Sequence, residues 1–160
     1  MDARERLMNY LDVKLERAKS ELKLEDLTAP FLVALFETSP GEYAINEKEA
    51  TDYFLDEKSK DALVKDLKEM CKDPTLKGLA VCFDGYSLLV DSDKEDAVPD
   101  NLADIKDTET ALITFMYLRD TSFNRMLPYK RKNKLDYWFG DNGWMESPPR
   151  FEGRFANPFK

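Results

Sequence analysis

Apolar residues recur every three or four positions along the first segment of the chain. The recurring positions are Leu7, Leu11, Leu15, Ala18 and Leu22. This spacing places them on one side of an α-helix, and charged residues fill the other sides. The pattern predicts an amphipathic surface helix over residues 2–23, which ends before Pro30.

A continuous apolar run follows at residues 31–36. Its periodicity fits a short buried strand or a short piece of buried helix equally well. The neighbouring residues favour a strand, because Pro40 and Gly41 are typical of a turn and residues 43–45 can return as a short partner strand. We therefore expect a β-hairpin.

Helix-forming residues dominate from Glu47 to Asp73. An apolar face is expected over Leu55, Leu63, Val64, Leu67 and Met70. A break near residues 56–59 would divide the segment into a short helix and a longer one. Pro74 ends the longer helix, because proline disfavours helical geometry in the residue before it.

The remaining strong apolar patterns predict strands at residues 78–91, 110–119 and 124–132, with a bend or bulge at Asp84 and Gly85. Together these elements predict an α+β fold. We expect an antiparallel sheet of about four to five strands, with the N-terminal amphipathic helix and the central helix packed on one face.

The length of 160 residues suits one domain, with a folded body over 1–139 and an irregular segment over 140–160. That last segment holds Pro148, Pro149 and Pro158 among several large aromatic residues, so we expect it to pack on the body without regular structure.

Composition indicates a protein of the cytoplasm. The apolar share is 42%, and the longest apolar run, residues 31–36, is far too short to span a membrane. The charged N-terminus lacks the pattern of a secretory signal. The two cysteines, Cys71 and Cys82, are expected to be thiols in reducing surroundings.

Charge divides the chain into two parts. Residues 1–118 hold 27 acidic and 15 basic residues, whereas residues 119–160 hold 5 acidic and 9 basic ones. The whole chain carries a formal charge of −8. Such an uneven distribution indicates either internal electrostatic pairing or a separate surface for a partner.

The absence of histidine restricts the chemistry most. It removes the usual general base and the commonest zinc ligand, and it excludes serine–histidine and cysteine–histidine pairs. No glycine-rich phosphate loop is present. Residues 91–96 begin like a calcium loop, but Asp96 stands where such a loop needs glycine. We expect no cofactor and no bound metal, and the residues favour a non-catalytic protein.

Two groups of residues are candidate binding surfaces. The acidic patch comprises Asp91, Asp93, Glu95, Asp96 and Asp100. The basic segment begins at Arg125 and continues with Lys130, Arg131, Lys132 and Lys134, interleaved with aromatic residues. Residues 130–134 also fit an exposed hairpin tip whose aromatics turn inward. Trp144 and Arg150 are of the kinds that anchor protein interfaces.

These features favour a small, acidic, non-catalytic accessory protein that binds another protein, one that carries basic residues. A carboxylate-dependent enzyme that uses a divalent metal is one alternative. A nucleic-acid-associated or nucleic-acid-mimicking protein is another, although a pI near 4.7 argues against binding a polyanion. The sequence leaves the oligomeric state open.

Overall fold

The computed structural model describes residues 2–25, 29–87, 109–133, 136–139, 145–147 and 157–159. In chain order, the elements are helix α1 (Ala3–Glu25), strands β1 (Phe31–Ser39) and β2 (Glu42–Glu49), the short 3₁₀ helix η1 (Thr51–Phe54), helix α2 (Glu57–Met70), and strands β3 (Leu76–Ser87), β4 (Glu109–Leu118), β5 (Ser122–Asn133), β6 (Asp136–Phe139) and β7 (Met145–Ser147). The predicted α+β class with an antiparallel sheet is confirmed.

Helix α1 forms as its apolar stripe predicts. Leu7, Leu11, Leu15 and Ala18 are all buried, and the backbone N–H of Glu5 donates to the Asp2 carboxylate at 2.8 Å. That bond satisfies one of the free donors at the start of the helix. The helix therefore begins at a capped end and buries one side.

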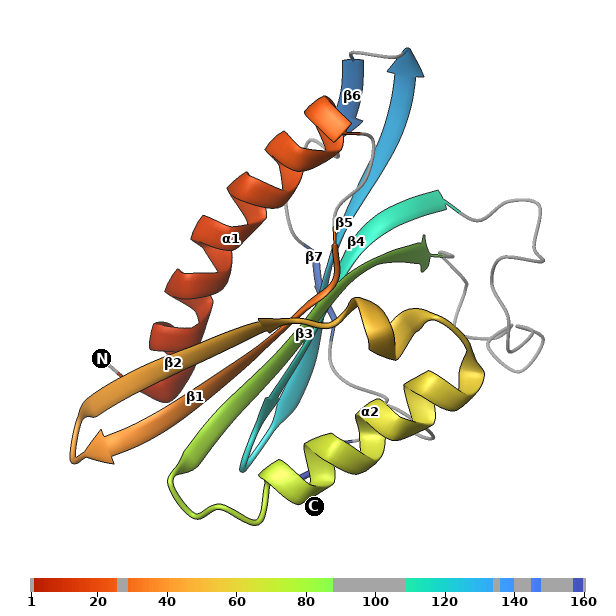
Figure 1. Cartoon of the computed structure of the whole chain (residues 1–160). Helices are drawn as coiled ribbons and strands as arrows, with labels where there is room; N and C mark the ends of the chain where they lie inside the picture. The colour runs from red at the N-terminus through yellow and green to blue at the C-terminus, as the bar shows by residue number, and fades with distance from the viewer. Residues whose placement is uncertain are drawn as a thin grey trace, which may run out of the picture.

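The sheet runs in the order β2-β1-β3-β4-β5-β6, and β7 also pairs with β5 (Figure 1). Neighbouring strands are antiparallel, from Leu35 opposite Ile45 to Ile113 opposite Met126. Gly41, with φ of +78°, closes the predicted β1–β2 hairpin. The five long strands match the expected number, whereas the sequence analysis assigned no strand to the residues of β6 and β7.

The two helices lie on opposite faces of the sheet, so the prediction that both pack on one face is wrong. Leu63 and Leu67 of α2 pack with Leu32, whereas Leu7 and Leu11 of α1 pack with Val33. Successive residues of a strand point to opposite faces, and β1 is buried at every position from Leu32 to Leu35. Such an unbroken apolar run requires cover on both sides.

Three local predictions are also corrected. Residues 47–49 belong to β2 and not to a helix. Leu55 is 69% exposed because it lies in the break before α2, outside the buried face formed by Leu63 and Leu67. Strand β3 continues through Asp84 and Gly85 without a shift, because its pairing with β4 stays in register there.

The C-terminal part is described only in pieces. Met145–Ser147 pairs with residues 124–126 of β5, so this part of the predicted irregular segment is a strand. Asn157 donates to the main-chain oxygen of Leu118 at 3.0 Å, and Phe159 packs against the α2 side of the sheet. These residues lie on the body as expected.

Neither of the described helices has the length and apolar character that a membrane-spanning helix needs.

Candidate functional site

Most of the residues predicted to bind lie outside the described part of the chain. This is so for the whole acidic patch, Asp91, Asp93, Glu95, Asp96 and Asp100, and for Lys134, Trp144 and Arg150. Lys130, Arg131 and Lys132 lie on β5, where the backbone pairs Lys130 with Trp138 and Arg131 with Tyr137. A hairpin is therefore present as the β5–β6 pair, but Lys130 and Arg131 lie in its paired strands and not at the tip that the sequence indicated.

Arg125, the first member of the basic segment, contacts the acidic N-terminal part. Its Nη1 lies 2.9 Å from the Asp12 carboxylate of α1 and 3.7 Å from the Met8 sulfur. The Arg125 side chain is only 11% exposed. Part of the uneven charge distribution thus serves internal pairing, which is one of the two roles that the sequence indicated.

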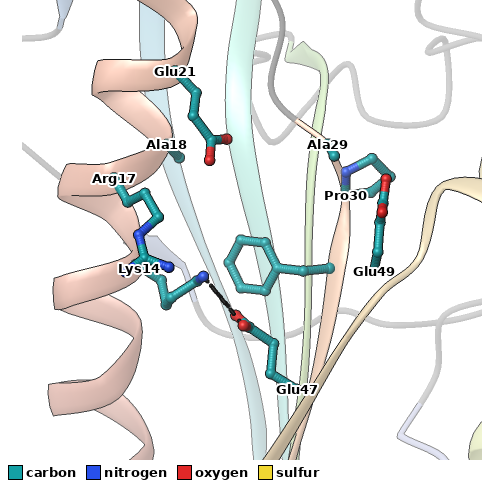
Figure 2. A pocket seen from close by; sticks show the side chains of 9 residues that line it. Lys14, Arg17, Ala18, Glu21, Ala29, Pro30, Glu47 and Glu49 are labelled. Atoms are coloured by element: carbon teal, nitrogen blue, oxygen red, sulfur yellow. Dashed lines mark hydrogen bonds and ion pairs between the residues drawn. The ribbon is translucent and has the colours of Figure 1, made fainter.

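A shallow cleft of about 190 Å³ lies between α1 and the β1–β2 pair (Figure 2). We call it the α1–β2 cleft. Its lining comprises Lys14, Arg17, Ala18, Glu21, Ala29, Pro30, Phe31, Glu47 and Glu49. Three carboxylates and two cationic side chains thus surround a floor of small and apolar residues.

Glu47 of β2 contacts Lys14 and Tyr10 of α1 beside the α1–β2 cleft. Lys14 Nζ lies 2.9 Å from Glu47 Oε1 and 3.2 Å from Oε2 (Figure 2), and the same ammonium lies 5.3 Å from the centre of the Phe31 ring. Burial raises the pKa of Tyr10, and the charge of Glu47 and a hydrogen bond to it raise that pKa further. These contacts fix α1 against β2.

The other charged groups of the α1–β2 cleft lie closer to solvent. Arg17 and Glu49 are exposed, and Glu21 is half-buried. Glu49 accepts a hydrogen bond of 2.7 Å from the Thr51 hydroxyl, which orients its carboxylate. In Figure 2, Arg17 and Glu21 extend from successive turns of α1 across from Glu49.

A second cleft, of about 360 Å³, lies where α1 begins and is lined by Asp2, Ala3, Arg4, Lys77, Leu118, Arg119, Asp120 and Thr121. Arg119 has a structural role there. It donates to the main-chain oxygens of Leu76 at 2.9 Å and Asp73 at 2.7 Å, and its guanidinium lies 4.9 Å from the centre of the Phe159 ring. We therefore take the α1–β2 cleft as the candidate site.

Charged side chains make up more than half of the lining of each cleft, and neither Cys71 nor Cys82 is among the lining residues. The α1–β2 cleft has no serine, threonine or cysteine among its described lining residues. Burial raises the pKa of both Cys71 and Cys82 to about 11, so each thiol is protonated near neutral pH and is a poor nucleophile. Within the ranges that the structure describes, no group of three or more acidic or cysteine residues could hold a metal ion.

Sequence reasoning missed the α1–β2 cleft because Glu47 and Glu49 were assigned to a helix. No apolar–polar alternation extends the strand past Ile45, because Asn46, Glu47, Lys48 and Glu49 are all polar, so the sequence carried no local signal for these two cleft residues. Comparison of the chain with protein-family models, with curated proteins and with solved structures gave no match.

Proposed function

We propose that the chain is a small, acidic, non-catalytic accessory protein that binds another protein through a basic side chain of that partner. The convergence of Glu21, Glu47 and Glu49 on the α1–β2 cleft carries the proposal. Three carboxylates outnumber the two cations, Lys14 and Arg17, so the lining has a net negative charge. The net charge of the whole chain, −8, also favours approach of a basic protein.

The floor of the α1–β2 cleft suits the long stem of a lysine or arginine. Ala18, Ala29, Pro30 and Phe31 supply apolar surface beside the carboxylates. Lysine and arginine side chains bury their aliphatic stems on such surfaces while the charged head stays near acidic groups and water. A basic residue of a partner can therefore use both parts of the lining.

The acidic patch at residues 91–100 and the basic segment with Trp144 and Arg150 belong to the same proposal as further contact surfaces. The carboxylate-dependent enzyme and the nucleic-acid-associated protein remain predictions from sequence. No contact within the described residues favours either over protein binding.

The test compares two variants that lose the same amount of charge. The double variant Glu21→Gln/Glu49→Gln removes two carboxylates from the α1–β2 cleft and leaves the Lys14–Glu47 pair intact. The control, Asp61→Asn/Glu69→Gln, removes two carboxylates from α2 on the opposite face. Proteins retained from an extract of the source cells are quantified by mass spectrometry at low and high salt.

We expect the wild type and the α2 control to retain the same partner in stoichiometric amount, and the cleft variant to lose it. Retention should fall at high salt, because exposed ion pairs are screened. Equal retention by both variants would show that the cleft is not the binding site. A wild type that retains no partner would contradict protein binding itself.

A further inference from the structure

Strand β2 is the terminal strand of the sheet. It pairs with β1 on one side, and Figure 1 shows it as the outermost strand of the hairpin. Among the described residues, no second strand pairs with it. An edge strand presents a row of backbone N–H and C=O groups on its outer side, where another strand can add.

The side chains of β2 form two rows. Tyr43 and Ile45 pack against the α1 layer. Glu42, Ala44, Asn46 and Lys48 lie on the other face and are all exposed. Asn46 lies opposite Ala34 of β1, which belongs to the α2 side, so the exposed row is on the face that α2 covers elsewhere.

The charges of β2 are placed in a way that permits strand addition. Natural edge strands often prevent it with charged residues along the edge. In β2 four consecutive residues, from Tyr43 to Asn46, are uncharged, whereas Glu42, Glu47, Lys48 and Glu49 are charged. On the exposed row the end residues have opposite signs, Glu42 at one end and Lys48 at the other.

This row is complementary to itself. Two copies of β2 that pair antiparallel about a two-fold axis through Ile45 place Glu42 of each copy opposite Lys48 of the other. Ala44 then lies opposite Asn46, and the two Ile45 residues lie opposite each other. If the two-fold axis passed through Ala44, Lys48 would lie opposite Pro40. If the axis passed through Asn46, Lys48 would lie opposite Ala44. Only the Ile45 register therefore forms both charge pairs.

We propose that two copies of this chain associate through their β2 strands, antiparallel and centred on Ile45, to form one continuous sheet across a two-fold axis. Opposite charges that face each other across neighbouring strands stabilise pairing, and like charges destabilise it. An isologous contact of this kind closes at two subunits. The proposal does not depend on the partner that the α1–β2 cleft binds.

Because the two-fold axis is perpendicular to the sheet, each face of the joined sheet is built from the same face of both copies. The two α1 helices, and with them the two α1–β2 clefts, then lie on one side of the dimer. In this register, Tyr43 of the second copy lies opposite Glu47 of the first copy.

Charge reversal tests the register in solution. Glu42→Lys and Lys48→Glu each turn two attractive pairs into two repulsive ones, so each should raise the dissociation constant by about tenfold or more. The double variant Glu42→Lys/Lys48→Glu restores both pairs and should dimerise like the wild type. An equimolar mixture of the two single variants should form a mixed dimer, because their charges are complementary.

The measurement is sedimentation over a dilution series at low salt, with Lys65→Glu on α2 as the control for a charge change away from β2. Single variants that weaken the dimer, a double variant that restores it and an unaffected control would support the proposal. A wild type that stays monomeric at the highest concentration would overturn it. So would a dimer that charge reversal leaves unchanged.

A cross-link tests the centre of the register independently. Ile45→Cys places two thiols opposite each other at the axis, and mild oxidation should give a covalent dimer. Ala44→Cys alone should not, because its partner across the axis is Asn46. Wild-type protein controls for cross-linking through Cys71 and Cys82. A covalent dimer from Ala44→Cys and none from Ile45→Cys would refute the proposed register.

Discussion

Gly78 marks a point where α1 lies close to the sheet. A Cβ atom at this position would lie 3.2 Å from the side chains of both Leu7 and Leu118. Leu7 is fully buried, so its side chain has little room to move away. The absence of a side chain at Gly78 thus allows α1 to pack directly on β3.

We expect Gly78→Ala to lower the free energy of unfolding by about 1–3 kcal/mol, because the added methyl overpacks this contact. Denaturant titration measures the change. In a Leu118→Val background, which frees space beside the methyl, the same substitution should cost less. If Gly78→Ala stabilised the protein instead, the smaller conformational entropy of the unfolded chain with alanine would outweigh the close contact.

Cys82 lies under α1 and is 6% exposed. Burial is the main cause that raises the pKa of its thiol from 9.0 to about 11. Between pH 9 and about pH 11 the Cys82 thiol is deprotonated in the unfolded chain, whereas it keeps its proton in the folded chain. The stability contributed by the neutral thiol is therefore present below pH 9 and is lost as the pH rises from about 9 to about 11.

Denaturation midpoints across this pH range test the linkage. The fall in stability of the wild type should be smaller in Cys82→Ala, because the titrating group is gone, whereas other groups that titrate in this range are common to both proteins. If the denaturation midpoints of the two proteins fell equally with pH, Cys82 would not be a buried thiol with a raised pKa. Alkylation of folded wild-type protein at pH 8 should also leave Cys82 unmodified.

At the scale of elements, α2 begins at a side-chain cap. Asp56 accepts a hydrogen bond of 2.7 Å from the backbone N–H of Ser59, and bonds to Ser59 are the main cause that lowers the pKa of this carboxyl. Capping satisfies a donor that the helix leaves free. The break before α2, expected from the sequence, is therefore the cap of the longer helix.

Asp56→Ala should destabilise the protein and lower its melting temperature by a few degrees. Because the folded pKa lies below the unfolded value, the charged cap contributes above about pH 4 and its contribution is lost as the pH falls through the folded pKa. The difference between wild type and variant should shrink in acid. A difference between wild type and variant that stays constant into acid would contradict a charged cap.

Sequence patterns predict an element well where one signal dominates. The leucine stripe gave α1, and the unbroken run at residues 31–36 gave β1. Residues 47–49 were misassigned because glutamate and lysine favour helices and show no apolar–polar alternation here, whereas tertiary pairing with β1 makes these residues a strand. The sequence analysis also placed α2 on the wrong face of the sheet. A continuous apolar run indicates that both faces of the strand are buried, but it does not indicate which helix covers which face.

At the scale of the whole molecule, the candidate site depends on contacts that no local pattern encodes. Lys14 and Glu47 are 33 positions apart, and Asp12 and Arg125 are 113 apart. Charge counting predicted that the two parts of the chain could pair, and the Asp12–Arg125 bond is one such pair. The particular partners follow only from the fold, which brings α1 across β2 at one place and across β5 at another.

A double-mutant cycle on Asp12→Ala and Arg125→Ala measures this long-range pair. We expect a coupling energy of about 1 kcal/mol or more, because the Arg125 side chain is largely removed from solvent. The same cycle on the exposed pair Glu69 and Lys72 should give no more than about 0.5 kcal/mol. Equal coupling in the two cycles would show that burial adds nothing to the Asp12–Arg125 contact.

Strand β1 has a further consequence for how the molecule opens. It lies between β2 and β3, and its residues from Leu32 to Leu35 face the α1 and α2 layers in turn. Neither layer can separate from the sheet without exposing apolar side chains of this one strand. The amide protons of Leu32 to Leu35 should therefore exchange with solvent only when the whole chain unfolds. The residues whose side chains face α1 and those whose side chains face α2 should exchange at the same slow rate.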